Sequence, residues 1–162
     1  MSLLQALDFA AKKHKLQRRK DNTTPYINHP IGVALLLEQA GITDTKVLMA
    51  ALLHDTIEDT ETTFKELENH FGIEVADLVQ TLSDDMTLTS EERKKHQVEK
   101  MKTASTNTRV IKMADRIYNL RDMGIWPIEK QKVYKYWGRA LLASCTNTNP
   151  LLEKWLSIES KE

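Results

Sequence analysis

The sequence contains too few of several residue types to support some classes of protein. Its 162 residues include one cysteine, five glycines and four prolines. A single cysteine can form neither an internal disulfide nor a thiolate zinc site, which excludes disulfide scaffolds and zinc ribbons and favours a reduced, cytoplasmic setting. The scarcity of glycine and proline leaves few positions where a helix must end. The composition therefore favours an all-α fold.

An excess of one charge and a long apolar run are also absent. Lysine and arginine number 23, and aspartate and glutamate number 23, so the formal net charge is zero. These totals require neither nucleic acid nor an anionic membrane as a partner. No apolar run approaches the roughly 18 residues of a membrane span, and no basic segment precedes the apolar N-terminal residues. We expect no membrane span, no signal peptide, and a single domain over residues 1–162.

Apolar residues recur at helical spacing along most of the chain, and no segment alternates as a strand would. The pattern predicts a compact bundle of roughly eight to ten helices. The residues expected on core faces include Leu3, Leu4, Leu7 and Ala11 near the N-terminus, Val33, Leu36, Leu37 and Ala40 next, Val110, Met113, Ala114 and Ile117 later, and Tyr134, Trp137, Leu141 and Leu142 towards the C-terminus.

Capping signals mark the starts and ends of several helices. Thr63 with Glu66, and Thr89 with Glu92, each have the spacing of a capping box. Gly72 is placed to end the helix that Thr63 begins. The segment after Thr89 is highly charged, so we expect a peripheral helix there. Three of the five histidines, His14, His70 and His96, lie in charged segments and are expected at the surface rather than in a metal site.

A dense polar group, HDTIED at residues 54–59, follows the apolar segment VLMAALL. If one helix runs through it, Glu58 lies four residues after His54, and Asp59 lies four after Asp55, so these side chains share a face. Carboxylates packed so closely repel one another unless a cation or a proton neutralises them. A divalent metal is the simplest account, and a solvated helix end is the alternative.

A second polar stripe lies on a later helix. Lys112, Asp115, Asn119 and Asp122 recur at i, i+3, i+7 and i+10, and the opposite face of this helix is apolar. Taken alone, such a stripe is more often a solvated flank than a site. Upstream, the prolines on either side of His29 place this histidine at a joint between a loop and a helix.

These segments resemble a known family, the HD-domain phosphohydrolases. The metal ligands of that family are a lone histidine, an adjacent His-Asp pair and a distant aspartate, which correspond here to His29, His54, Asp55 and Asp115. RRKDNTTPYINHP, AALLHDTIEDT and VIKMADRIYNLRDM are similar to the hydrolase domain of the RelA/SpoT enzymes, which degrade the alarmone ppGpp. The similarity covers residues 5–125, and helices in residues 128–160 would complete the bundle. The chain resembles the small, stand-alone animal members of this family.

The resemblance implies a central metal site and a hydrolytic activity. One Mn²⁺ ion is the implied cofactor, and two imidazoles with two carboxylates suit it. The ion would hold a phosphate and lower the pKa of a water, which Glu58 and Asp59 would orient or deprotonate. The implied reaction is that of a guanosine-3′,5′-bis(diphosphate) 3′-diphosphatase, which converts ppGpp to GDP and pyrophosphate.

A polyanionic substrate requires local cations on a protein of zero net charge. The resemblance favours Arg19 and Lys20, which precede His29, together with Asn119, four residues after Asp115. Further candidates for substrate contacts are Arg18, Lys112, Arg116 and Tyr134. The charged segment at residues 87–95 could cover the site or be a plain exposed helix.

Two other functions stay open at this stage. The same metal chemistry could release the 2′-phosphate of another nucleotide such as NADPH. A protein that only senses a nucleotide is the other alternative, although a binder of polyanions gains nothing from the acidic pair Glu58 and Asp59 near the phosphates. The sequence does not indicate the oligomeric state.

Overall fold

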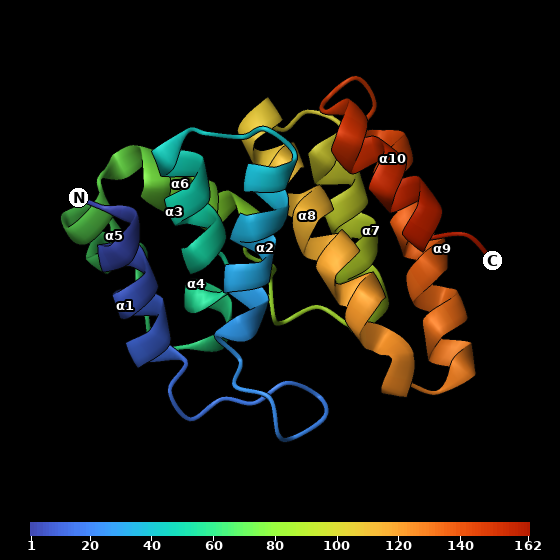
Figure 1. Cartoon of the computed structure of the whole chain (residues 1–162), viewed down its shortest axis with the longest axis horizontal. Helices are drawn as coiled ribbons and strands as arrows, with labels where there is room; N and C mark the ends of the chain where they lie inside the picture. Colours follow the sequence, from blue (N-terminus) through green and yellow to red (C-terminus); the bar gives the residue numbers. More distant parts are fainter. The chain divides into compact units, whose positions relative to one another are not determined.

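The structure is a computed structural model that describes residues 1–162. It contains helices α1 to α10 (Figure 1) and one short 3-10 helix. The only β-type pairing is an isolated bridge between Arg18 and Pro25. The expected all-α fold is therefore confirmed. The chain divides into two compact units, Met1–Ser83 and Asp84–Glu162. No helix is both long and apolar enough to cross a membrane.

The first unit is built around one buried helix. Its elements are α1 (Leu3–Lys13), α2 (Asn28–Gln39), α3 (Thr45–Leu53), α4 (Thr56–Asp59), α5 (Phe64–Phe71) and α6 (Ile73–Leu82). Helix α3 contacts α1, α2 and α6, which explains why its residues from Val47 to Leu53 are all apolar. Because α3 is central, the polar residues that follow it begin inside the unit.

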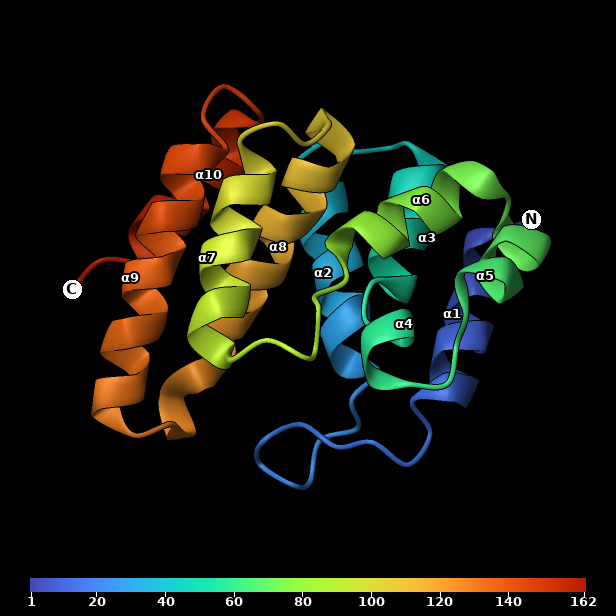
Figure 2. The same ribbon diagram turned by 180° about the vertical axis from the view of Figure 1, so that it is seen from behind.

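The second unit consists of α7 (Ser90–Met101), α8 (Thr106–Asp122), the 3-10 helix η1 (Met123–Ile125), α9 (Ile128–Ser144) and α10 (Pro150–Glu159) (Figure 2). Helix α8 packs against α9 and α10, and α7 packs against α9. The predicted core face of α8, from Val110 to Ile117, is buried as expected. Helix α7 buries only Met101, in agreement with its predicted peripheral position.

The predicted caps are confirmed with one difference. Both halves of the capping box between Thr89 and Glu92 are present. The Thr63 hydroxyl likewise accepts the backbone N–H of Glu66, but the Glu66 carboxylate pairs instead with Lys13 Nζ of α1 at 2.8 Å. A tertiary ion pair has thus replaced the second half of this local motif.

The prediction for the core face of α1 is wrong in part. Leu4 is 74% exposed, whereas Ala6 and Ala10 are completely buried. These small side chains allow the backbone of α1 to lie close to α3, which it contacts. Hydrophobicity alone favours burial of the leucines, but the short distance between the two helices favours burial of the alanines.

Candidate metal centre

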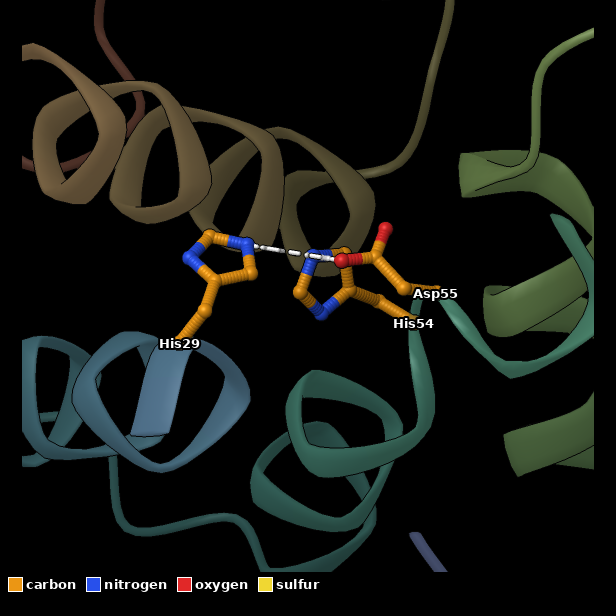
Figure 3. A group of neighbouring side chains, drawn as sticks. All are labelled: His29, His54 and Asp55. Carbon is orange, nitrogen blue, oxygen red and sulfur yellow. Dashed lines mark hydrogen bonds and ion pairs between the residues drawn. The ribbon is translucent and has the colours of Figure 1, made fainter. Parts of the chain in front are cut away.

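Three predicted ligand side chains of the first unit converge (Figure 3). His29 Nε2 lies 3.3 Å from His54 Nε2, and Asp55 Oδ2 lies 3.4 Å from the first nitrogen and 3.1 Å from the second. Two ligand atoms that are each about 2.1 Å from a shared ion lie about 3.0 to 3.4 Å apart at octahedral or tetrahedral angles. The donor set and its spacing therefore fit a divalent cation.

Packing of α2 against α3 brings the two histidines together. His29 lies in the first turn of α2 and is 1% exposed, and His54 follows the last residue of α3 and is 3% exposed. The two helices contact each other, so residues that are 25 positions apart in the chain meet at their ends. The loop-to-helix joint predicted for His29 is confirmed.

The prediction of one continuous helix through residues 54–59 is wrong. Helix α3 ends at Leu53, and α4 begins at Thr56. The Thr56 hydroxyl donates to the Leu53 carbonyl at 2.7 Å, and His54 Nδ1 lies 2.8 Å from the Ala51 carbonyl. Side chains thus satisfy carbonyls at the end of α3, and the chain can turn there without losing hydrogen bonds.

The contact of His54 also fixes which of its nitrogens can bind a metal. A carbonyl oxygen only accepts hydrogen bonds, so His54 Nδ1 carries the hydrogen and donates it to Ala51. The lone pair of the neutral ring then lies on Nε2, which is the atom that faces His29 and Asp55. Such a bond on the second ring nitrogen is common in metal-binding histidines.

Asp55 is held in its ionised form. Burial by itself would raise the pKa of this carboxyl, but the neighbouring His54 and His29 hold the pKa well below its ordinary value of 3.8. In addition, the Tyr26 hydroxyl donates to Asp55 Oδ2 at 2.6 Å. A charged carboxylate beside two imidazoles is a set of atoms suited to a cation.

The loop before α2 is ordered by Asp21. Its side chain accepts the backbone N–H groups of Thr23 and Thr24 at 2.9 Å and the Thr24 hydroxyl at 2.5 Å. The hydrogen bonds from Thr24, and then that from Thr23, lower the pKa of Asp21 to about 2. A fixed loop conformation therefore presents the predicted substrate-binding cations, Arg18, Arg19 and Lys20.

These three cations differ in their surroundings. The Arg19 guanidinium lies 5.6 Å from the ring centre of Tyr26, the residue that hydrogen-bonds to Asp55. Arg18 donates to the backbone carbonyl of Gln17 at 3.1 Å and is exposed, as is Lys20. Arg19 therefore has the clearest structural connection to the three ligand side chains.

The predicted stripe on α8 is organised around Asp115 in the second unit. Lys112 Nζ lies 3.1 Å from Asp115 Oδ2, and the Asn119 amide donates to Asp115 Oδ1 at 2.7 Å. Lys112 and Asp115 are buried, so this part of the stripe is not a solvated flank of the helix. Only the end of the stripe, at Asp122, is exposed to solvent.

Cations gather around Arg116 in the same unit. Its guanidinium is buried, lies 4.3 Å from the ring centre of Tyr134 and donates to Gln97 at 3.2 Å, while its Nε and Nη1 atoms make no hydrogen bond. Burial and the nearby charges of Arg116 and Arg93 lower the pKa of Lys94. Buried donors without acceptors among mutually repelling cations favour the binding of an anion.

Some residues near the ligands were not identified from the sequence. The expectation that His14 is a surface residue is wrong, since it is 2% exposed and packs against Tyr26 with a ring-centre distance of 4.9 Å. His70 and His96 are exposed, as predicted. Tyr26 lies within the motif TPYINHP, so it could have been identified, but nothing in the sequence marks His14 as buried.

Comparisons with known proteins show the family of this chain. The family model of the HD domain matches residues 6–142. The chain is 50% identical over 161 residues to the human guanosine-3′,5′-bis(diphosphate) 3′-pyrophosphohydrolase MESH1, covering 95% of this chain and 90% of that protein. It is 42% identical over 157 residues to MESH1 of Drosophila melanogaster, covering 93% and 88%.

A solved structure is similar as well. It is that of a metazoan orthologue of SpoT that hydrolyses ppGpp and plays a role in starvation responses. It matches with a TM-score of 0.92 and 40% identity, over 97% of this chain and 92% of the other. The match to the family model and the extent of these similarities identify the chain as a member of the HD-domain family.

Proposed function

We propose that this protein hydrolyses ppGpp to GDP and pyrophosphate with one bound Mn²⁺ ion. The observation that carries the proposal is the convergence of His29 Nε2, His54 Nε2 and Asp55 Oδ2 in a chain that is half identical to human MESH1. In the reaction, water attacks the phosphorus next to the ribose 3′ oxygen. The bond between these two atoms breaks, and the 3′ oxygen takes up a proton.

The chain's own residues would hold the ion and orient the water. His29, His54 and Asp55 would bind the ion, which when bound supplies positive charge at the phosphate and lowers the pKa of a water. Glu58 and Asp59 lie on α4, directly after Asp55, and outside the group of three converging ligands. Their carboxylates would accept protons from the attacking water and fix its direction.

We also propose Asp115 as the fourth ligand, as the family resemblance implies. Its carboxylate is buried and is held by Lys112 and Asn119, so its conformation is fixed. The variant Asp115→Asn keeps the shape of the side chain and removes its charge. Weaker binding of Mn²⁺ by this variant would support the proposal, and unchanged binding would contradict it.

Cations would bind the phosphates of the substrate. Arg19 and Lys20 belong to the ordered loop before α2, and Asn119 offers an amide beside Asp115. The guanidinium of Arg116, with donors that make no hydrogen bond, would receive a further phosphate, supported by Lys112 and by the ring of Tyr134. A cytoplasmic location, where nucleotides are abundant, is part of the same proposal.

The test is analysis of the products from purified protein. The protein is incubated with Mn²⁺ and either ppGpp or NADPH, beside the variants Asp55→Asn and Asp77→Asn. Asp77 is an exposed aspartate on α6 and serves as the matched control. We expect the protein and Asp77→Asn to release GDP and pyrophosphate from ppGpp, and Asp55→Asn to release neither. Replacing Mn²⁺ with Mg²⁺ or Zn²⁺ tests the identity of the ion.

Each other result has a definite meaning. Phosphate released from NADPH alone would retain the metal chemistry but replace the substrate. No turnover of either nucleotide would contradict the proposal and favour a sensor. The variant Glu58→Gln separates a hydrolase from a sensor. In a hydrolase this change should slow turnover at least about 100-fold with the metal retained, whereas a sensor should bind nucleotide as before.

A further inference from the structure

A chain of hydrogen bonds connects a buried histidine to the acidic pair. His14 Nδ1 lies 2.7 Å from Gln17 Oε1, and Gln17 Nε2 donates to Asp59 Oδ2 at 3.0 Å. Gln17 and Asp59 are 42 residues apart, so the contact is tertiary and was not indicated by any motif. The amide of Gln17 therefore bridges His14, at the end of α1, and the last residue of α4.

The chemistry of the three groups allows one orientation of this amide. An ionised carboxylate only accepts hydrogen bonds, so the NH₂ end of Gln17 must face Asp59. The carbonyl end then faces His14, whose Nδ1 must carry the hydrogen. With the amide reversed, acceptor would face acceptor at Asp59. A donor on His14 thus matches, at the other end of the amide, the arrangement in which Gln17 donates to Asp59.

His14 and Gln17 are both fixed in place. The backbone N–H of His14 donates to the Ala10 carbonyl at 2.9 Å, and its ring packs on Tyr26. The backbone N–H of Gln17 donates to the backbone carbonyl of His14 at 2.9 Å, and the backbone carbonyl of Gln17 accepts the backbone N–H of Tyr26 at 3.0 Å. Because the backbone of Gln17 is bound on both sides, its side chain starts from a defined position.

Asp59 by contrast has few local constraints. It is exposed and ends a helix of four residues. We propose that Gln17 is a positioning residue for Asp59, and that His14 sets the orientation of the Gln17 amide. The inference rests on the proposed function, because it assumes that Asp59 orients or deprotonates the attacking water. Gln17 and His14 touch neither the substrate nor the ion in this scheme.

A double-mutant cycle tests the inference with ppGpp and Mn²⁺. The variants are Gln17→Ala, Asp59→Ala and their combination, with Gln80→Ala, an exposed glutamine on α6, as the matched control. We expect Gln17→Ala to lower kcat about 10-fold with KM changed less than about 2-fold, because the carboxylate loses its direction. In the Asp59→Ala background, the same change should have no further effect. If the two changes lower kcat independently, so that the double variant shows the product of the two single losses, the inference is overturned.

His14→Phe tests the second half of the inference. Phenylalanine keeps a ring against Tyr26 and removes the donor to Gln17, so kcat should fall as in Gln17→Ala and no further when both changes are present. A readout without catalysis is the NMR signal of the Gln17 side-chain amide. This signal should shift in both Asp59→Ala and His14→Phe, and an unchanged signal would overturn the inference.

The cycle also separates this inference from the proposed function. If Asp59→Ala is slow while Gln17→Ala has the kcat of the unmodified protein, the positioning role is wrong and the hydrolase proposal stands. If the unmodified protein does not hydrolyse ppGpp, the proposed function fails and the positioning role fails with it. Metal content should remain equal in all variants, since none changes a converging ligand.

Discussion

The tyrosine next to the candidate metal ligands has several contacts at once. Tyr26 donates to Asp55, packs against His14 and lies under the Arg19 guanidinium. Of these contacts only the hydrogen bond needs its hydroxyl. Removing that oxygen therefore isolates the effect of a hydrogen bond on a ligand carboxylate from the effects of packing.

We expect Tyr26→Phe to weaken binding of Mn²⁺ about 10-fold, since loss of a hydrogen bond to a ligand costs on the order of 10- to 100-fold in metal affinity. Calorimetric titration of the metal-free protein measures this change. Tyr136→Phe, at an exposed tyrosine of the second unit, is the matched control and should leave the affinity unchanged. Equal affinities for the two variants would show that the hydroxyl does not support the ligand.

At the scale of elements, the close packing of α9 depends on a glycine. A Cβ atom built on Gly138 would lie 3.0 Å from Ser160 Cβ and 3.3 Å from Leu120 Cδ1. Both neighbours belong to elements that α9 packs against, namely the end of α10 and helix α8. Helix propensity alone would favour alanine at this position, but the available space favours glycine.

Gly138→Ala should therefore lower the free energy of unfolding by about 1 kcal/mol, because overpacking costs about 1–3 kcal/mol and the gain in helix propensity returns at most about 1 kcal/mol. Urea unfolding monitored by circular dichroism measures the difference. Gly124→Ala is the control, since no heavy atom beyond its two chain neighbours lies within 4 Å of its Cβ position. A Gly138→Ala protein as stable as the control would mean that α10 moves aside without cost.

At the scale of the whole molecule, the metal should contribute to stability. All three converging ligands belong to the first unit, and two of them are buried histidines. An ion that binds only the folded chain stabilises it by mass action. Any separate melting transition of the first unit should therefore respond to metal.

We expect Mn²⁺ at 100 times its dissociation constant to stabilise the fold by about 2.7 kcal/mol, which corresponds to a rise in Tm of about 5–10 °C for a chain of this size. Differential scanning calorimetry, with and without a chelator, measures the shift. His54→Ala, which removes a converging ligand, should abolish it. A full shift in this variant would place the stabilising ion elsewhere.

Local patterns in the sequence determined the helices, several of their ends and the candidate ligands. The periodicity of Val110 to Ile117 and the capping box at Thr89 depend only on neighbours along the chain, and the structure confirms both. The family's motifs likewise identified His29, His54 and Asp55 as residues that should meet. Such features are predictable because backbone hydrogen bonding and amphipathic spacing act over a few residues.

Tertiary structure alone decided which residues from distant segments meet. It buried Ala6 in place of Leu4, turned the chain between α3 and α4, buried His14, and joined Gln17 to Asp59. Each outcome depends on how closely helices pack and on which donors and acceptors remain once the backbone is satisfied. Those conditions do not exist within any short segment, so the sequence pattern determined the candidate ligands of this site, and the packing of distant segments determined the residues that contact them.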